Sequence, residues 1–250
     1  MSAAALPTRT TELGSRTALP PNFRLSVVIP VFNEVGTLGQ VIERVRATGL
    51  SCEIIVVDDG STDGTRAMLA KFAPGNDLVV VLHATNQGKG AALKTGFLKA
   101  AGDIVLVQDA DLEYHPADYL RLMQPIIDGA ADVVYGSRFL TREGASGKTR
   151  HWHTLANRFV TRLSNHFTGL QLTDMETCFK VFRRDVIQQI APTLEQRGFG
   201  IEPELTAKVA RLPNIRLVEV PIRYTARGYA DGKKIGWRDG LWALWCVMKY

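Results

Sequence analysis

The sequence has little cysteine, and the cysteines that it has are far apart. Cys52, Cys178 and Cys246 are odd in number and show no metal-ligand spacing. This pattern excludes a disulfide-stapled scaffold and a cysteine-based zinc site, and it is typical of a reducing compartment. The sequence also lacks any window of about 20 apolar residues, so we expect no segment that spans a bilayer.

The common glycine-rich nucleotide motifs are missing too. No G-x-G-x-x-G follows the first predicted strand, which argues against a dinucleotide cofactor. Residues 144–149 read GASGKT, but only two residues separate the glycines and no buried strand precedes them, so we reject a P-loop. Residues 1–23 lack the apolar centre of a signal peptide and are predicted to form a disordered tail.

The sequence does contain enough apolar residues for one large core. It has 250 residues, of which 46% are hydrophobic, and a net charge of +5. This length and composition favour a single large domain. The mild positive charge fits anionic substrates, anionic lipid surfaces or nucleic acid, and does not choose among them.

Short apolar runs alternate with amphipathic segments. Helices are predicted after each of the first four strands, and again at 152–167, 203–210 and 235–250. Residues 139–153 and 223–234 are predicted to be basic loops. The alternation is typical of an open, mostly parallel α/β sheet flanked by helices. The strands are predicted at 25–31, 53–58, 78–82, 104–107, 132–136 and 215–220.

Polar clusters follow five of these strands at the point where each strand ends. Ligands of open α/β sheets bind at the carboxyl ends of the strands, so we expect the clusters to line one site. They are Asn33-Glu34, Asp58-Asp59, the stretch from Asn86 to Gly90, Asp109 to Asp111, and Ser137-Arg138.

The most informative cluster is the acidic pair Asp109 and Asp111. Two carboxylates that close repel each other unless a divalent cation lies between them or the loop is well hydrated. Hard oxygen ligands suit Mg²⁺ or Mn²⁺, which in turn suit a diphosphate. A solvated acidic loop is the alternative for an isolated pair, but the other strand-end clusters favour the metal.

The remaining clusters suggest contacts to a nucleotide and to phosphate. Asp58 and Asp59 can accept hydrogen bonds from a base or a ribose, and Lys89 lies in a glycine-rich helix start that could bind an anion. Arg138 follows a buried strand and suits bidentate phosphate binding. Either of two acidic pairs, Asp174 with Glu176 or Glu202 with Glu204, could hold a general base, and for Glu202 the alternative is a favourable charge at the start of a helix.

Residues 235–250 are predicted to form an amphipathic helix at a membrane interface. Tryptophans and aliphatic residues alternate there with lysine and arginine, a composition that suits the lipid headgroup region. The helix predicted at 152–167 could add a second contact. The alternative is that these helices pack into the core or a dimer interface.

The segments VVIPVFNE, VVDDGSTDGT, NQGKGAALKTGF, DADLEYHP and YGSRF, in that order, resemble the inverting family-2 glycosyltransferases with the GT-A fold. More narrowly, with LTDMETCFKVF, GFGIEPELTAKVAR and EVPIRYTARGYADGKKIGWRDG, the chain is similar to polyprenyl-phosphate mannosyl- and glucosyltransferases of the dolichyl-phosphate type. The resemblance covers about residues 24–249. It implies one GT-A domain over 24–234, followed by the interface helix.

The resemblance implies roles at the matching positions. Asp109 and Asp111 would hold the metal, with Glu113, where relatives often carry glutamine, as a third ligand. The acceptor phosphate would contact Arg138, Arg150, Arg223 and Arg227. Catalysis would rest on Asp109, Asp111, Arg138 and, for a hydroxyl acceptor, on Asp174 or Glu176. The nucleotide sugar would contact Pro30, Phe32, Glu34, Asp58, Asp59, Lys89, Asp109 and Ala110.

The resemblance implies a metal-dependent enzyme that moves a hexose, with inversion, from UDP-glucose or GDP-mannose to a polyprenyl phosphate. We expect it to be cytoplasmic and peripheral at the inner face of the cell membrane, attached by its own helix or through a partner. The expected protein partner is a membrane protein or a second copy of the chain. A sugar or lipid hydroxyl acceptor is the alternative, and an inert binding module is a third possibility. Nucleic acid is not expected, because the acidic strand ends would repel its phosphates.

Overall fold

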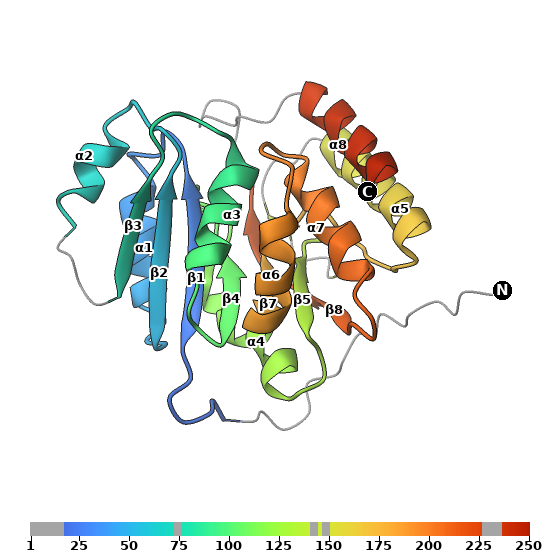
Figure 1. Ribbon diagram of the computed structural model, residues 1–250, viewed down its shortest axis with the longest axis horizontal. Helices are drawn as coiled ribbons and strands as arrows, with labels where there is room; N and C mark the ends of the chain where they lie inside the picture. The colour runs from blue at the N-terminus through green and yellow to red at the C-terminus, as the bar shows by residue number, and fades with distance from the viewer. Residues whose placement is uncertain (1–17, 73–76, 141–144, 147–150, 227–236) are drawn as a thin grey trace.

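The computed structural model describes residues 18–72, 77–140, 145–146, 151–226 and 237–250, which are built around a mostly parallel sheet (Figure 1). Its seven strands lie in the order β3-β2-β1-β4-β7-β5-β8, and β7 runs antiparallel to its neighbours β4 and β5. This architecture confirms the predicted fold class, a GT-A sheet flanked by helices. The strands are β1 (Leu25–Val31), β2 (Cys52–Asp58), β3 (Leu78–Leu82), β4 (Ile104–Val107), β5 (Val133–Ser137), β7 (Lys180–Arg183) and β8 (Leu217–Pro221).

Helices cover both faces of the sheet. In Figure 1, α3 (Lys89–Lys99) and α6 (Arg184–Ile190) lie in front of the sheet and α1 (Leu38–Arg46) lies behind it. α4 (Tyr119–Ile127) packs on β5, and α5 (His151–Thr168), α7 (Ile201–Ala210) and α8 (Trp237–Lys249) pack against one another. The short elements are α2 (Thr65–Leu69), η1 (Pro116–Asp118), η2 (Ala191–Thr193) and the pair β6 (Ala145–Ser146) and β9 (Tyr224–Thr225).

The core forms where apolar strands meet the apolar sides of helices. Every residue of β1 is buried, because parallel strands are covered on both faces. On α1 the predicted side packs inward through Leu38, Val41, Ile42 and Val45. Burial of each such side chain contributes roughly 1.5–3 kcal/mol to the free energy of folding. Val35, predicted on the same side, is 45% exposed because the helix begins only at Leu38.

The second half of the chain departs most from the prediction. The apolar segment 178–182 contributes strand β7, which enters the sheet between β4 and β5, and α6 follows it unpredicted. Within the predicted loop 139–153, Ala145–Ser146 form β6 and α5 begins at His151. Of the predicted tail, residues 1–17 lie outside the described residues.

Candidate active site

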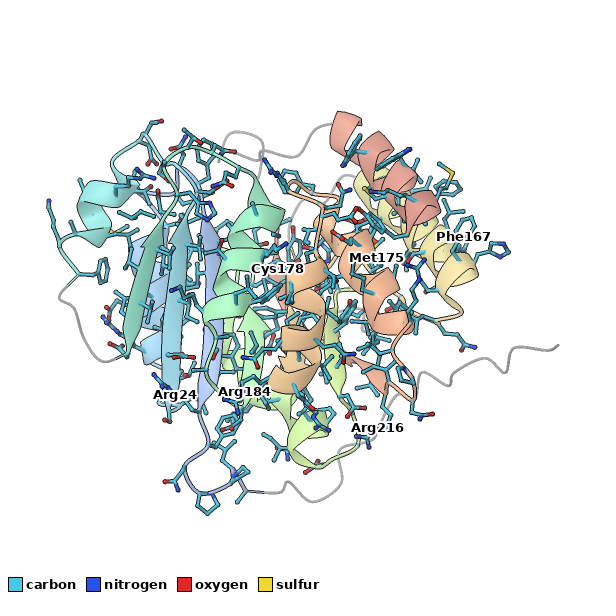
Figure 2. The ribbon with its side chains drawn as sticks, viewed as in Figure 1. Arg24, Phe167, Met175, Cys178, Arg184 and Arg216 are labelled. Atoms are coloured by element: carbon cyan, nitrogen blue, oxygen red, sulfur yellow. The ribbon has the colours of Figure 1, made fainter. Side chains whose placement is uncertain are left out.

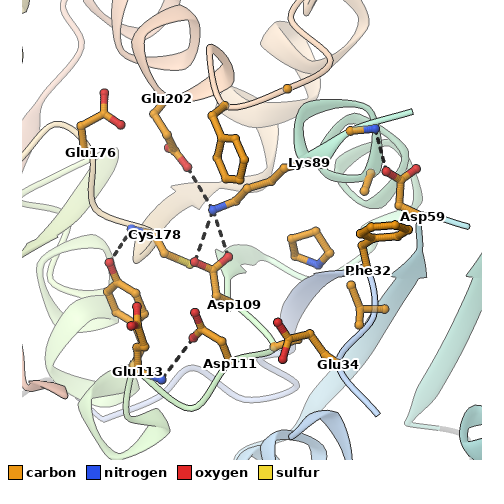
Figure 3. A pocket seen from close by; sticks show the side chains of 18 of the residues that line it. Phe32, Glu34, Asp59, Lys89, Asp109, Asp111, Glu113, Glu176, Cys178 and Glu202 are labelled. Atoms are coloured by element: carbon orange, nitrogen blue, oxygen red, sulfur yellow. Dashed lines mark hydrogen bonds and ion pairs between the residues drawn. The ribbon is translucent and has the colours of Figure 1, made fainter. Parts of the chain in front are cut away.

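A cavity of about 450 Å³ opens at the carboxyl ends of β1, β4 and β5 (Figure 3). Most residues predicted from the strand ends therefore share one site, because parallel strands end at a common edge. Predicted residues that line it are Pro30, Phe32, Glu34, Asp59, Lys89, Asp109, Ala110, Asp111, Glu113, Arg138 and Glu176. Asp58, Asp174 and Arg223 do not line it, and Arg150 and Arg227 lie outside the described residues.

The two neighbouring aspartates after β2 have different surroundings. Asp58 is fully buried, and its Oδ1 accepts the N–H groups of Gly60 and Ser61 and a bond of 2.6 Å from Arg66 Nε. Its Oδ2 has no hydrogen-bond partner among the described residues. Asp58 therefore supports the turn behind the cavity wall.

Asp59 joins the loops after β2 and β3. Its carboxylate accepts the N–H of Gln87 at 3.0 Å and that of Gly88 at 2.6 Å, and it lies 2.7 Å from His83 Nδ1. With these bonds made, Asp59 holds the start of α3 against the site. A role at a nucleotide would use its remaining lone pairs.

The glycine-rich start of α3, where an anion site was expected, packs closely on the backbone of residues 196–198. A Cβ on Gly88 would lie 2.4 Å from the carbonyl oxygen of Arg197, and one on Gly90 would lie 2.1 Å from that of Gln196. The N–H of Gly90 donates to the Arg197 carbonyl at 2.6 Å, and the N–H of Ala91 does so at 3.1 Å. A backbone carbonyl therefore already accepts the N–H groups of Gly90 and Ala91, and an anion at this helix start would have to use Lys89.

The acidic stretch after β4 turns sharply enough to bring Asp109 and Asp111 to the same cavity (Figure 3). Leu112 has a positive φ of 65°, which is costly for a leucine and marks a constrained turn. The N–H of Glu113 donates to Asp111 Oδ1 at 3.1 Å. Glu113 itself accepts a bond of 2.8 Å from the hydroxyl of Tyr224.

These residues fit a divalent cation that is shared with a diphosphate. The described residues contain no group of three or more His, Cys, Asp or Glu side chains arranged to hold a metal ion by themselves. Mg²⁺ and similar ions commonly take one or two carboxylates and complete their shell with substrate phosphates and water. Asp109 and Asp111 supply such a pair of oxygen donors, so the fit does not require Glu113.

A row of alternating charges, which the sequence did not reveal, supports Asp109 and runs from the cavity wall into the interior. Lys89 Nζ lies 3.0 Å from Asp109 Oδ1 and 3.4 Å from Glu202 Oε1 (Figure 3). Glu202 also pairs with Lys180, a lysine that is only 1% exposed. Burial alone would lower the pKa of Lys89, but Asp109 and Glu202 raise it well above its ordinary value. Lys89 therefore stays a cation at the acidic end of the cavity.

The burial and pairing of Lys180 and Glu202 were not evident from the sequence. Lys180 lies inside the apolar run of residues 178–182, and nothing nearby in the sequence showed which group would compensate its charge there. Its ammonium also donates to the carbonyls of Met175 and Thr177, which fixes the loop that carries Glu176. Glu202 lies in the first turn of α7, where an acidic residue is also favoured when it is exposed, so its type did not indicate burial. A lysine in the middle of an apolar strand was the available signal.

Arg138 lies at the end of β5 and is held by Asp174. Its Nε donates to Asp174 Oδ2 at 2.6 Å, and one terminal nitrogen donates to Oδ1 at 2.7 Å. The guanidinium packs 5.1 Å from the ring centre of Tyr224 and 5.7 Å from that of Phe139. Burial alone would lower the pKa of Arg138, but Asp174 raises it well above the usual value.

Arg223, predicted at the acceptor phosphate, points elsewhere in this structure. Its backbone N–H donates to Asp118 Oδ2 at 2.8 Å, and its guanidinium pairs with Oδ1 of the same residue at 3.1 Å. The side chain is 59% exposed, so this pair is weak and leaves the arginine free to move at little cost.

Glu176 is the predicted base that faces the cavity. Its Oε1 is buried and has no hydrogen-bond partner among the described residues. Burial raises the pKa of Glu176 to about 7, with a further increase from the nearby Glu202. Met175 and Cys178, which lie on either side of it along the chain, are buried in the interior (Figure 2). Asp174, in contrast, has its carboxylate engaged by Arg138.

The family of the chain follows from sequence comparison. The sequence profile described as glycosyl transferase family 2 matches residues 26–191, which include every strand-end cluster of the site. The chain belongs to this family and is therefore a glycosyltransferase. Its mostly parallel sheet and its site at the carboxyl edge agree with that class.

Curated relatives of similar sequence come from several bacteria. The chain is 33% identical over 220 residues to the undecaprenyl-phosphate 4-deoxy-4-formamido-L-arabinose transferase of Klebsiella pneumoniae, and the match covers 86% of this chain and 63% of that protein. It is 31% identical to the undecaprenyl-phosphate mannosyltransferase of Micrococcus luteus, over 85% of this chain and 88% of that protein. For the polyprenol monophosphomannose synthase of Mycolicibacterium smegmatis the identity is 30%, over 86% and 83%.

Solved structures share the fold. The glucosyl-3-phosphoglycerate synthase of Mycobacterium tuberculosis, crystallised with Mn²⁺, UDP and phosphoglyceric acid, superposes with a TM-score of 0.67. The superposition covers 91% of this chain and 78% of that one, at 22% sequence identity. At this identity the likeness establishes the fold alone. Within the described residues, no helix combines the length and apolar character needed to cross a bilayer.

Proposed function

We propose that this glycosyltransferase moves a hexose from a nucleoside-diphosphate sugar to a polyprenyl phosphate at a membrane surface, with Mg²⁺ or Mn²⁺ as cofactor. UDP-glucose and GDP-mannose are the first donors to test. Two of the relatives match this chain over most of their own length, and their names contain undecaprenyl phosphate or polyprenol. The observation that carries the proposal is the arrangement of an acidic pair and a half-buried arginine around one cavity.

The donor would occupy the part of the cavity between β1 and β4. Pro30 and Phe32 offer apolar wall, while Glu34 and Asp59 offer acceptors for hydroxyl groups. Asp109 and Asp111 would hold the metal, which when bound would neutralise charge on the departing nucleoside diphosphate. Lys89, a cation beside Asp109, would add to the same stabilisation.

The acceptor phosphate would approach Arg138 from the cavity. Asp174 engages one edge of the guanidinium, and the remaining N–H groups are available to orient an anion. Because Asp174 offsets the charge of Arg138, the arginine would position the phosphate without fully quenching its nucleophilic oxygen. A phosphate monoester is ionised near neutral pH, since its second pKa is about 6. It would attack the anomeric carbon without a general base.

Glu176 supports a second candidate function, transfer to a sugar or lipid hydroxyl. A hydroxyl must lose its proton during attack, and a carboxylate with a pKa of about 7 is well matched to accept it. Asp174 is less suited, because both of its oxygens are bound to Arg138. Under the first proposal Glu176 would have no proton to accept from the phosphate.

The membrane surface is proposed as the location of the reaction, at the cytoplasmic face. The amphipathic helix predicted at 235–250 corresponds to α8, on which Trp242, Trp245 and Met248 are between 43% and 61% exposed. On α5, Leu155 and Phe159 are 61% and 59% exposed, and Phe167 points outward (Figure 2). Exposed tryptophan and leucine beside lysine and arginine suit the headgroup region.

The decisive experiment is a donor and acceptor screen with the purified full-length chain. Radiolabelled UDP- and GDP-sugars are incubated with Mg²⁺ or Mn²⁺, with and without polyprenyl phosphate. Label in an alkali-stable lipid that mild acid releases is the expected result. Transfer to a hydroxyl acceptor, lost in Glu176→Gln, would support the second candidate, and no transfer from any donor would contradict both.

A further inference from the structure

A buried glutamate outside the cavity holds the loop that carries Asp174. Glu219 lies on β8 and is 7% exposed. Its Oε2 accepts the N–H of Thr173 at 2.8 Å, and its Oε1 accepts the N–H of Asp174 at 3.0 Å. Each oxygen of the carboxylate thus fixes one of two successive peptide groups.

The residue type at this position matches the groups that it meets. Both backbone groups are donors, and an ionised carboxylate presents only acceptors. A glutamine of the same shape would turn its own NH₂ toward one of these donors, so one bond would be lost and one buried N–H left unpaired. Burial raises the pKa of Glu219 to about 7, so keeping the ionised carboxylate here has a cost in stability.

The loop that Glu219 holds determines where Arg138 points. Asp174 accepts the backbone N–H of Arg138 at 3.1 Å as well as the two guanidinium bonds. Thr173 and Ser137, the residues beside this pair, lie 2.6 Å apart through their hydroxyl oxygens. From α5, the side-chain amide of Asn157 donates to Asp174 Oδ1 at 3.2 Å. A shift of Asp174 would therefore rotate the guanidinium at the cavity wall.

We propose that Glu219 is a positioning residue, which orients Arg138 through Asp174 for the acceptor phosphate. This assignment rests on the proposed function for its kinetic consequence, although the orientation of Arg138 can be measured without it. Loss of the Glu219 bonds would weaken acceptor binding and leave the donor side of the cavity intact.

The kinetic test compares Glu219→Gln with a matched control, Glu53→Gln. Glu53 is also a buried carboxylate, and it accepts the N–H groups of Ala101 and Gly102 at 2.7 and 3.1 Å. It lies at the amino end of β2, whereas the cavity lies at the carboxyl ends of the strands. We expect Glu219→Gln to raise the KM for polyprenyl phosphate about five- to tenfold. Its kcat and donor KM should stay within about twofold of the wild type. Glu53→Gln should lower the Tm without raising the acceptor KM.

A spectroscopic test keeps the proposal independent of activity. The NMR signal of the Arg138 Nε–H is identified by its absence in Arg138→Lys. In the wild type this proton should exchange slowly with water, because Asp174 accepts its hydrogen bond. Glu219→Gln should speed this exchange about fivefold, and Glu53→Gln should not. If Glu219→Gln does not fold, Glu219→Asp, which withdraws the carboxylate by one methylene, should act in the same direction.

Unchanged Nε–H exchange in the Glu219 variant, or an equal rise of the acceptor KM in both variants, would overturn the positioning role. Absence of transfer by the wild-type enzyme would contradict the proposed function instead, and the exchange measurement would still decide on Glu219.

Discussion

Two carboxylates that lie two positions apart in the sequence have opposite surroundings. Asp174 is bound to Arg138, so its charge is compensated at close range. Glu176 faces the cavity with an unpartnered buried oxygen, so burial favours its protonated form. At the residue scale, the site therefore separates a carboxylate that orients a cation from one that can exchange a proton near neutral pH.

The raised pKa of Glu176 predicts a specific dependence of stability on pH. The pKa of about 7 in the folded protein exceeds the ordinary glutamate pKa of 4.5, so the folded protein binds more protons between these two pH values. Ionisation of Glu176 thus lowers the free energy of unfolding as the pH rises through this range. Glu176→Gln removes this loss. Between pH 4.5 and pH 8, the free energy of unfolding of the variant should rise by roughly 2–3 kcal/mol relative to that of the wild type, as measured by urea denaturation. A stability difference that does not change with pH would contradict this assignment.

Asp111→Asn tests the proposed metal pair. The amide keeps the shape of the side chain but removes a charge that a divalent cation needs. We expect Mn²⁺-dependent binding of UDP or GDP to weaken at least tenfold, by calorimetry, and transfer to fall by about two orders of magnitude. Asp185→Asn, at an exposed aspartate paired with Arg183, should leave both unchanged. Nucleotide binding that is equally metal-dependent in Asp111→Asn would exclude this residue as a ligand.

At the element scale, the close contact of α3 with β1 brings the start of α3 to the cavity. Gly96 lies against Val28, and a Cβ at this position would be 2.3 Å from Val28 Cγ1. The helix can approach the sheet this closely because glycine has no side chain. Lys89, at the first turn of the same helix, then reaches Asp109 at the end of β4.

Gly96→Ala should therefore destabilise the protein by about 2 kcal/mol, because the helix or Val28 must move to admit the methyl group. Gly240 provides a matched control in a helix, since a Cβ there meets nothing within 4 Å. Gly240→Ala should be neutral or stabilising by up to about 1 kcal/mol. Thermal denaturation of both variants checks the pair. Equal effects would show that helix propensity, and not the contact with Val28, decides the outcome.

At the scale of the whole molecule, the cavity and the exposed apolar helices belong to one domain. α5 reaches the acceptor side of the site through Asn157, which donates to Asp174. α8 packs on both α5 and α7, and α7 carries Glu202. A membrane that contacted α5 and α8 would therefore lie against the elements that support the site.

Vesicle sedimentation tests this arrangement. Trp245→Ser combined with Phe159→Ser should lower binding to anionic vesicles about tenfold, because two exposed apolar side chains would no longer enter the headgroup region. Leu98→Ser, at a leucine of α3 that is 52% exposed, serves as the control and should bind like the wild type. Equal binding of all three proteins would exclude α5 and α8 as the membrane contact.

The local pattern of the sequence was sufficient for the strands β1 to β5 and for the acidic pair at the end of β4. Hydrophobic periodicity and turn residues act over a few positions, and parallel strands necessarily bring their carboxyl ends together. The antiparallel entry of β7 between β4 and β5 was not predictable in this way. It depends on which partners are free in the sheet after the first strands have paired.

The tertiary structure also decided which charged residues pair with one another. The row Asp109, Lys89, Glu202 and Lys180 joins residues from four separate elements or their ends, and nothing near any one of them in the sequence signals the others. The same holds for Asp174, which the sequence predicted as a candidate base and which forms an ion pair with Arg138 in the structure. Residue type and spacing set the available chemistry, whereas burial and pairing, which depend on distant segments, set the charge and orientation that each group adopts.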